Sequence, residues 1–147
     1  MIKPMSIEVV FTEESTATGG GREGHVKSSD GRIDLETRHP KAMGGNGEGT
    51  NPEQLFSAGY AACFLGALRL VARTEKIDVD DASGITAQVG FGKDSDGGFG
   101  INAHLIGYLP GMEQSAADQL MEKAHQVCPY SKATRGNIDV KLSAKTV

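Results

Sequence analysis

The residues in this sequence with the greatest capacity for chemistry are its two cysteines, Cys63 and Cys128. They lie too far apart in the chain to form a Cys-x-x-Cys redox motif or a zinc-ligand array. Their spacing leaves two interpretations open. Each thiol is a small buried hydrophobe, or the two form a redox pair in which one thiolate attacks an oxidant and the other resolves the product as a disulfide.

The redox interpretation requires a positive charge near Cys63. A buried thiol has a raised pKa and is inert unless its thiolate is stabilised. The dipole of a helix that begins near Asn51 would not help, because Cys63 lies about 18 Å along it, at about 1.5 Å per residue. The basic residues that could supply the charge are Arg22, Arg69, Arg73 and Arg135, and composition does not choose among them.

The order of the strands and helices expected along the sequence predicts an α+β fold in which antiparallel pairing is favoured. These elements must position the cysteines and the basic residues. A loop around Arg22 is expected over 16–24, and a turn at Asp30-Gly31 is typical of a hairpin. The segments expected to form strands are 7–11, 25–28, 32–37, 85–93, 99–108 and 138–142.

Two long helices are predicted. The first begins at Asn51, a good N-cap, and Pro52, which suits the first helical position, and it runs to about Thr74. Its segment 55–68 is apolar all round and rich in small residues. It should therefore be fully buried against a closely packed second helix or the same helix of a partner subunit. The second helix, over 113–127, has apolar residues at helical spacing and ends at Pro129.

The composition points to an oligomer. Only 38% of the residues are hydrophobic, while glycine numbers 20 in 147 residues, about twice the usual ~7%. A chain with few large apolar side chains must pack its backbone closely or bury surface against another chain. With no internal repeat, linker or boundary in the sequence, we expect a single domain over 1–147 that forms a homo-oligomer.

Charge and hydropathy exclude several partners. The formal net charge is −4 and no basic run occurs, so no nucleic-acid partner is expected. The apolar stretch 55–68 is shorter than the ~20 residues that span a bilayer, and the N-terminus has no apolar signal region. We therefore expect a cytoplasmic protein without a membrane partner. The four histidines have no metal-ligand spacing, so neither a catalytic role nor a metal site is predicted for His25, His39, His104 and His125.

Long motifs around both cysteines resemble a known family, and the likeness covers nearly the whole chain. Residues 49–68 read G-T-N-P-E-Q-L-F-S-A-G-Y-A-A-C-F-L-G-A-L, and residues 127–140 read V-C-P-Y-S-K-A-T-R-G-N-I-D-V. Both resemble the organic hydroperoxide resistance (Ohr) proteins, the thiol-peroxidase branch of the Ohr/OsmC family, as do the N-terminal segments T-A-T-G-G-G-R-E-G-H-V and P-K-A-M-G-G. Ser57 and Lys132 stand where Ala and Asn are more usual, outside the expected reacting groups.

The resemblance implies a role for each matching residue. Cys63 would be the peroxidatic cysteine and Cys128 the resolving one. Arg22 would hold the Cys63 thiolate and polarise the peroxide, and Glu53 would orient Arg22 through a bidentate ion pair. The implied fold is OsmC-like, with antiparallel sheets and two long helices, and it forms an intertwined homodimer with two active sites at the subunit interface. The implied reductant is dihydrolipoamide on lipoylated proteins, with no bound cofactor.

Other interpretations of these residues are simpler. Arg22 could be a solvated charge, and Glu53 could belong to a capping box at the helix start. On one helix Glu53 and Cys63 would be about 15 Å apart, so we expect Arg22 or Glu53 to reach Cys63 across the dimer interface. The apolar residues around Cys63 predict a preference for bulky organic hydroperoxides over hydrogen peroxide. The rival functions are a non-catalytic module whose cysteines merely pack and an OsmC-like peroxidase of broader specificity.

Overall fold

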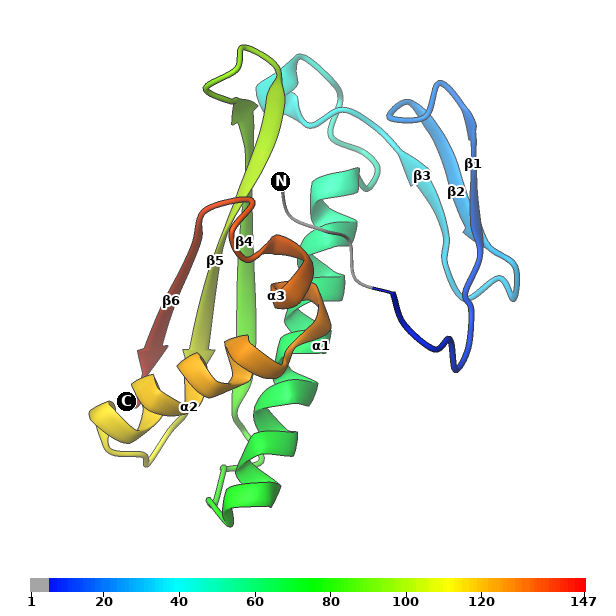
Figure 1. Ribbon diagram of the computed structural model, residues 1–147. Coiled ribbons are helices and arrows are strands. Elements are labelled where there is room, and N and C mark those ends of the chain that lie inside the picture. Colours follow the sequence, from blue (N-terminus) through cyan, green and yellow to red (C-terminus); the bar gives the residue numbers. More distant parts are fainter. Residues whose placement is uncertain (1–5) are drawn as a thin grey trace. The chain divides into compact units, whose positions relative to one another are not determined.

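The computed structural model describes residues 6–147, which form two compact units that divide after Asn51. Each unit has its own three-stranded sheet (Figure 1). The mixture of helices and sheets confirms the α+β class. The single domain expected over 1–147 stays a prediction.

The first unit is an antiparallel sheet followed by a loop. Its strands are β1 (Ser15–Gly19), β2 (Gly24–Ser28) and β3 (Asp34–Thr37), in the order β1-β2-β3. The Asp30-Gly31 turn between β2 and β3 is confirmed, with Gly31 at a φ of 77° that favours glycine. A single 3-10 turn, η1 (Lys41–Met43), follows the sheet.

The N-terminal part of the sequence prediction is wrong in two places. Residues 7–11 form no strand, because strand composition produces a ladder only where another strand pairs with it, and no described strand does. Their side chains are instead exposed, with 93% of Val10 and 77% of Phe11 accessible. The loop expected over 16–24 is shorter than predicted, since β1 occupies its first part and only 20–23 form the turn that carries Arg22.

The sheet of the first unit has no hydrophobic core of its own. Within residues 6–51 the buried side chains are polar: Ser28, Thr37 and Thr50. Leu35, on β3, is 42% exposed. A three-stranded sheet gains independent stability from a covered apolar face or a packed helix, and no apolar side chain within residues 6–51 is buried.

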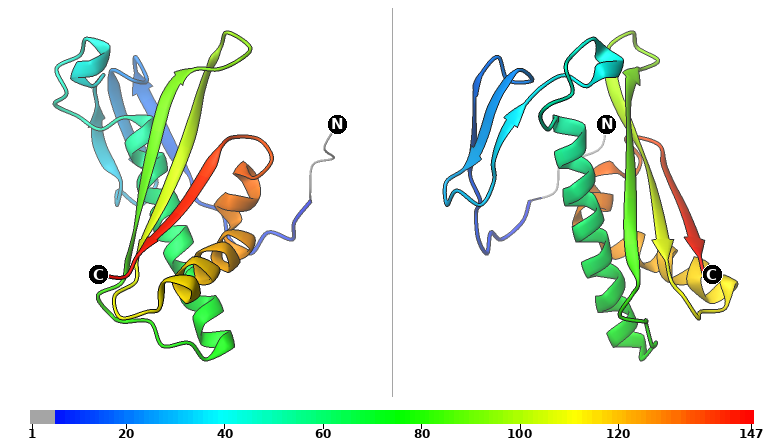
Figure 2. Two further views of the ribbon diagram at one scale, coloured as in Figure 1. Left: turned by 90° about the vertical axis from the view of Figure 1, so that its left-hand side faces the viewer. Right: turned by 180° about the vertical axis from the view of Figure 1, so that it is seen from behind.

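The second unit packs two long helices against one face of a mixed sheet. The helices are α1 (Pro52–Glu75), α2 (Gln114–Val127) and the short α3 (Pro129–Thr134). The strands are β4 (Gly84–Lys93), β5 (Phe99–Tyr108) and β6 (Val140–Lys145), in the order β4-β5-β6. Figure 2 shows α1 running along the sheet and α2 crossing its end. The predicted helices 52–74 and 113–127 are confirmed.

One strand departs from the antiparallel pattern that the sequence favours. β4 and β5 form the expected antiparallel hairpin, but β6 lies parallel to β5. The connection from β5 to β6 runs through α2 and α3, and a parallel neighbour requires a long crossover of this kind.

The hydrophobic core lies between the sheet and the helices of the second unit. Its largest fully buried apolar side chains are Tyr60, Phe64, Leu68, Leu105, Leu109, Leu120 and Met121. At Gly107 of β5 a Cβ atom would come within 2.5 Å of the Met121 sulfur. The absence of a side chain there lets α2 approach the sheet closely.

The helix that carries Cys63 is buried on one side only, so the expectation of full burial is wrong for the single chain. The sheet and α2 cover the face that contains Tyr60, Phe64 and Leu68. On the opposite face Ala58, Ala62 and Gly66 are exposed, four residues apart. This exposed stripe of small residues leaves α1 with a flat face.

Length and composition alone would allow α1 to cross a membrane, and it is the one such helix in residues 6–147. An 18-residue window within α1 has a mean hydropathy of 1.6 and at most two charged residues. This window is longer than the apolar stretch 55–68 that the sequence argument considered. One third of that window is buried inside the protein. Core helices of soluble proteins pass the same test, so this is weak support for a membrane span, and the absence of a membrane partner stays a prediction.

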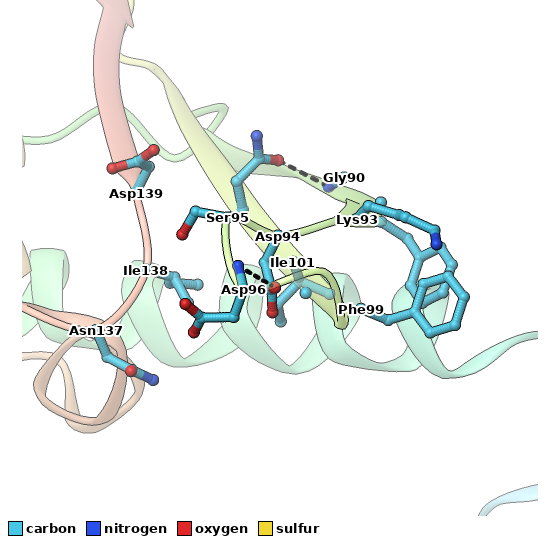
Figure 3. A pocket seen from close by; sticks show the side chains of 14 residues that line it. Gly90, Lys93, Asp94, Ser95, Asp96, Phe99, Ile101, Asn137, Ile138 and Asp139 are labelled. Carbon is cyan, nitrogen blue, oxygen red and sulfur yellow. Dashed lines mark hydrogen bonds between the residues drawn. The ribbon is translucent and has the colours of Figure 1, made fainter.

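A large open hollow lies at the tip of the β4–β5 hairpin (Figure 3). It has a volume of about 760 Å³ and lies between the hairpin and residues 137–139. Three carboxylates, those of Asp94, Asp96 and Asp139, line it. Asp94 already accepts hydrogen bonds from the backbone N–H groups of Asp96 and Gly98, at 2.9 and 3.0 Å, and so serves the hairpin turn.

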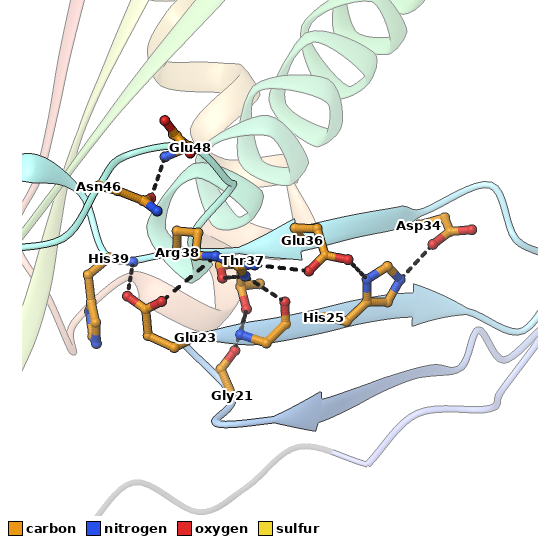
Figure 4. Close-up of polar contacts among 11 residues, drawn as sticks. Gly21, Glu23, His25, Asp34, Glu36, Thr37, Arg38, His39, Asn46 and Glu48 are labelled. Carbon is orange, nitrogen blue, oxygen red and sulfur yellow. Dashed lines mark hydrogen bonds and ion pairs between the residues drawn. The ribbon is translucent and has the colours of Figure 1, made fainter.

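A histidine of β2 joins two residues of β3 in the first sheet (Figure 4). His25 on β2 hydrogen-bonds to Glu36 through Nδ1 at 2.8 Å and to Asp34 through Nε2 at 2.6 Å, both on β3. These bonds, with Glu36 contributing most, raise the pKa of His25 above its usual 6.5. The bond to His25 likewise lowers the pKa of Glu36.

The His25 bridge predicts a pH-dependent sheet. A raised pKa in the folded state means that the bridge stabilises fully below about pH 6.5 and is lost as the pH rises through the folded value. We expect amide protection factors in β2 and β3 to fall between pH 6 and pH 9, and His25→Gln to abolish this dependence. His104→Gln, on the other sheet, is the control. An NMR titration that places the His25 pKa at or below 6.5 would contradict the prediction.

Candidate active site

The structure brings the two cysteines together. Cys63 on α1 is half-buried and Cys128 is fully buried, both are reduced, and their sulfur atoms lie 3.4 Å apart with the Cys128 S–H directed at Cys63. The sulfurs must close by only about 1.4 Å to reach a disulfide bond length of about 2.05 Å. The arrangement suits a thiol–disulfide cycle.

Cys128 is placed by a break between two helices. α2 ends at Val127, and Pro129 opens α3, so the prediction that Pro129 stops the helix is confirmed. The sequence analysis did not predict α3, which Pro129 can begin because the first position of a helix needs no N–H donor. Cys128 is held in an extended conformation (φ −62°, ψ 123°) between them.

A buried hydrogen-bond network fixes α3 against α1. Its centre is Ser131 of α3, whose hydroxyl lies 2.8 Å from both the Tyr60 hydroxyl and Nδ1 of His125. The Tyr60 hydroxyl also lies 3.0 Å from the hydroxyl of Thr134. All four residues are buried, where an unpaired hydroxyl would be costly. Ser131 therefore links α1, α2 and α3 at the point where the sulfurs meet.

The start of α3 lies directly over a glycine of α1. A Cβ atom at Gly59 would lie only 3.0 Å from the Tyr130 hydroxyl and 3.1 Å from its ring. The Tyr130 ring packs at centroid distances of 5.8 Å from Tyr60 and 6.1 Å from Phe56. Close packing by small residues of α1, expected from the sequence, is thus confirmed at Gly59, although the packing partner is α3.

The surroundings of Cys63 disfavour its thiolate. Burial raises the pKa of the Cys63 thiol, and its hydrogen bond with Cys128 raises it further. The backbone N–H of Tyr130 hydrogen-bonds to the sulfur and partly opposes this effect. The second unit therefore presents a thiol that needs further stabilisation to ionise near neutral pH, as the sequence argument anticipated.

Two of the four arginines considered as that stabilising charge contact backbone carbonyls of the second unit. Arg135 donates to the carbonyl of His125 at 2.9 Å, and Arg69 donates to that of Asp80 at 3.4 Å. Burial and, to a smaller extent, Arg135 lower the pKa of His125, while the nearby Glu122 carboxylate partly opposes this shift. Arg135 thus joins the end of α2 to the end of α3.

The other two predicted site residues lie elsewhere in the chain. Glu53 is in the first turn of α1, about 15 Å along the helix axis from Cys63. Arg22 belongs to the first unit, in the turn between β1 and β2. The second unit therefore joins Cys63 with Cys128 but not with Glu53. Residues 6–147 contain no cluster of three His, Cys, Asp or Glu side chains suited to a metal. That the protein binds no metal stays a prediction.

The residues that support the two thiols were not predicted from the sequence. Tyr60 precedes Cys63 by one helical turn, and Ser131 follows Cys128 by the same interval. The Tyr60 hydroxyl was the available signal, because residues three apart on a helix share a face, whereas Cys128 is extended and precedes α3. The contribution of the Tyr130 N–H is a backbone property with no sequence signal.

Comparison with known proteins gives one consistent result. Residues 45–143 match the model of the family described as OsmC-like protein. An organic hydroperoxide resistance protein of Xanthomonas axonopodis pv. citri is 51% identical over 137 residues, covering 92% of this chain and 95% of the relative.

Solved structures agree in fold. The crystal structure of the organic hydroperoxide resistance protein OhrB of Bacillus subtilis is 50% identical, covers 93% of this chain and 100% of that chain, and has a TM-score of 0.84. An organic hydroperoxide resistance protein from Elizabethkingia anophelis is 49% identical, covers 96% and 100% of the two chains, and has a TM-score of 0.88.

Removing the Tyr60 hydroxyl should weaken the network that holds α3. We expect Tyr60→Phe to lower the free energy of unfolding by about 1 kcal/mol, since Thr134 and Ser131 each lose a buried partner. Urea denaturation measures the change. Tyr108→Phe, which alters a 44% exposed side chain, should change stability by less than about 0.5 kcal/mol. Equal stability of Tyr60→Phe and the unmodified protein would contradict the prediction.

Proposed function

The chain belongs to the OsmC-like family and, within it, to the organic hydroperoxide resistance proteins, and we propose that it is a cysteine-based organic hydroperoxide reductase. The family membership supports a role in peroxide stress defence. The observation that carries the proposal is the 3.4 Å separation of the Cys63 and Cys128 sulfurs. At this distance a sulfenic acid on Cys63 can condense with the Cys128 thiol to form a disulfide without a large rearrangement.

The proposed cycle has three balanced steps. The Cys63 thiolate attacks the outer oxygen of the hydroperoxide, the O–O bond breaks, and the alcohol leaves after taking up a proton, which oxidises Cys63 to a sulfenic acid. Cys128 attacks the Cys63 sulfur, water leaves, and a disulfide forms. An external dithiol then reduces the disulfide and is itself oxidised. We propose dihydrolipoamide on a lipoylated protein as this reductant, with no cofactor bound to the chain.

Arg22 and Glu53 have supporting roles in this proposal. The raised pKa of Cys63 requires a cation, and the Arg22 guanidinium would stabilise the thiolate and polarise the peroxide, while Glu53 would orient the guanidinium. The apolar side chains beside Cys63 favour a bulky organic substrate. Phe56, two helical turns before Cys63, is a partly buried aromatic side chain that supports this preference.

A homodimer is part of the proposal, supported by surfaces that a single chain leaves uncovered. The first unit lacks a buried apolar side chain within residues 6–51, and residues 7–11 are exposed. The stripe formed by Ala58, Ala62 and Gly66 is flat enough for close approach of a second helix. We propose that the subunits intertwine and that Arg22 or Glu53 reaches Cys63 of the partner subunit.

The cysteine cycle can be tested by mapping disulfides. One equivalent of cumene hydroperoxide should convert the reduced protein to a form with a Cys63–Cys128 bridge, detected by mass spectrometry. Cys63→Ser should consume no peroxide. Cys128→Ser should consume about one equivalent and then stop, because no resolving thiol remains. Sustained turnover by Cys63→Ser would refute the mechanism, and unchanged thiols in the unmodified protein would favour a non-catalytic module.

A site shared between subunits predicts complementation between inactive variants. Cys63→Ser and Arg22→Gln homodimers should each be nearly inactive. A mixed dimer pairs an intact Arg22 on one subunit with an intact Cys63 on the other, so it should recover up to about half of the normal activity, one site of two. Light scattering verifies the dimer. Mixed dimers that stay inactive would indicate that Arg22 acts within its own chain, and Glu53→Gln tests the second residue in the same way.

A further inference from the structure

The turn that carries Arg22 is short and has little conformational freedom. It connects Gly19 of β1 to Gly24 of β2 and is closed by a 3.0 Å hydrogen bond from the Gly20 N–H to the Glu23 carbonyl. Gly21 has a φ of 77°, in the region that favours glycine. At Gly24 a Cβ atom would collide with the carbonyl oxygen of Thr18. The glycines here serve the tight return of the chain on itself.

A single buried hydroxyl holds this turn on both sides of Arg22. Thr37, at the end of β3 and only 3% exposed, donates to the Gly21 carbonyl at 2.6 Å and accepts from the Gly24 N–H at 2.8 Å. Figure 4 shows the Thr37 side chain beside Gly21. One side chain thus fixes the peptide before Arg22 and the backbone two residues after it.

The residues that follow Thr37 reinforce the same attachment. The His39 N–H donates to the Glu23 carboxylate at 2.9 Å, and the Arg38 guanidinium donates to the Gly24 carbonyl at 3.2 Å. The Arg38 guanidinium also donates to the Thr37 carbonyl at 2.6 Å. The segment 37–39 therefore acts as a support for the turn, with the Thr37 hydroxyl as its buried part.

We propose that Thr37 is a positioning residue for the peroxidase reaction, acting through the Arg22 turn. Its hydroxyl sets the path of the backbone at Arg22 and hence the direction in which the guanidinium projects. This inference rests on the role proposed for Arg22, because Thr37 can influence the Cys63 thiolate only through that guanidinium. Thr37 is not a catalytic residue, since it contacts backbone groups of its own unit and not the reacting atoms.

The test compares variants of Thr37 in the full chain carrying Cys128→Ser, which isolates Cys63. Thr37→Val keeps the side-chain shape but removes the hydroxyl. Thr37→Ala also removes the hydroxyl and leaves room for a water molecule at its position. Thr37→Ser keeps the hydroxyl, and Thr16→Val alters an exposed threonine of the same sheet. The readouts are the pH profile of Cys63 alkylation by iodoacetamide and the single-turnover rate with cumene hydroperoxide.

Thr37→Val and Thr37→Ala should raise the apparent pKa of Cys63 and slow the single turnover at pH 7 roughly tenfold, the factor that accompanies a pKa change of about one unit. Thr37→Ser and Thr16→Val should behave as the parent. Combining Arg22→Gln with Thr37→Val should give no further loss than Arg22→Gln alone, because both act through the same guanidinium.

The outcomes separate this inference from the function on which it rests. If Arg22→Gln raises the Cys63 pKa but both hydroxyl removals match Thr16→Val, Thr37 has no positioning role and the proposed function stands. If the two losses add fully in the double variant, Thr37 acts by another route and the inference is overturned. If Arg22→Gln leaves the Cys63 profile unchanged, the role of Arg22 fails and the positioning role of Thr37 fails with it.

Discussion

The contact on which the second unit depends is the buried hydroxyl of Ser131. Its bonds to Tyr60 and His125 join the helix that carries Cys63, the helix that ends before Cys128 and the short helix that follows Cys128. A hydrogen bond inside a protein is modest in net energy, but an orphaned buried hydroxyl is expensive, so the network is stable only when all its members are in place. The same helices carry or flank Cys63 and Cys128, whose sulfurs lie 3.4 Å apart.

The fold could be predicted from sequence wherever a local signal was decisive. Pro52 and Pro129 mark helix boundaries, and the Asp30-Gly31 turn marks a hairpin, because each fixes backbone angles by itself. The errors arose where the outcome depends on distant partners. The segment 7–11 finds no partner strand within residues 6–147. The direction of β6 depends on the crossover before it, and the burial of α1 depends on which of its faces is covered.

The candidate site was predictable in its reactive atoms but not in its supports. The spacing of Cys63 and Cys128 left both a redox pair and inert packing open, and only the resemblance to a family assigned roles. The structure then placed the two sulfurs in contact. Ser131, Tyr130 and Thr37 act through tertiary contacts or backbone groups, and such contacts are invisible in composition or periodicity. The raised pKa of Cys63 could be anticipated from the sequence because burial raises the pKa of a thiol in any fold.

The glycine at position 59 has a consequence for comparing relatives of this protein. With 3.0 Å between a Cβ atom there and the Tyr130 hydroxyl, any larger residue would require the Tyr130 side chain of α3 to give way. Position 59 is therefore a diagnostic marker in an alignment. A homologous chain that keeps a glycine there has room for a tyrosine ring packed against its first long helix, whereas one with a bulky residue needs a smaller or displaced side chain at the position of Tyr130.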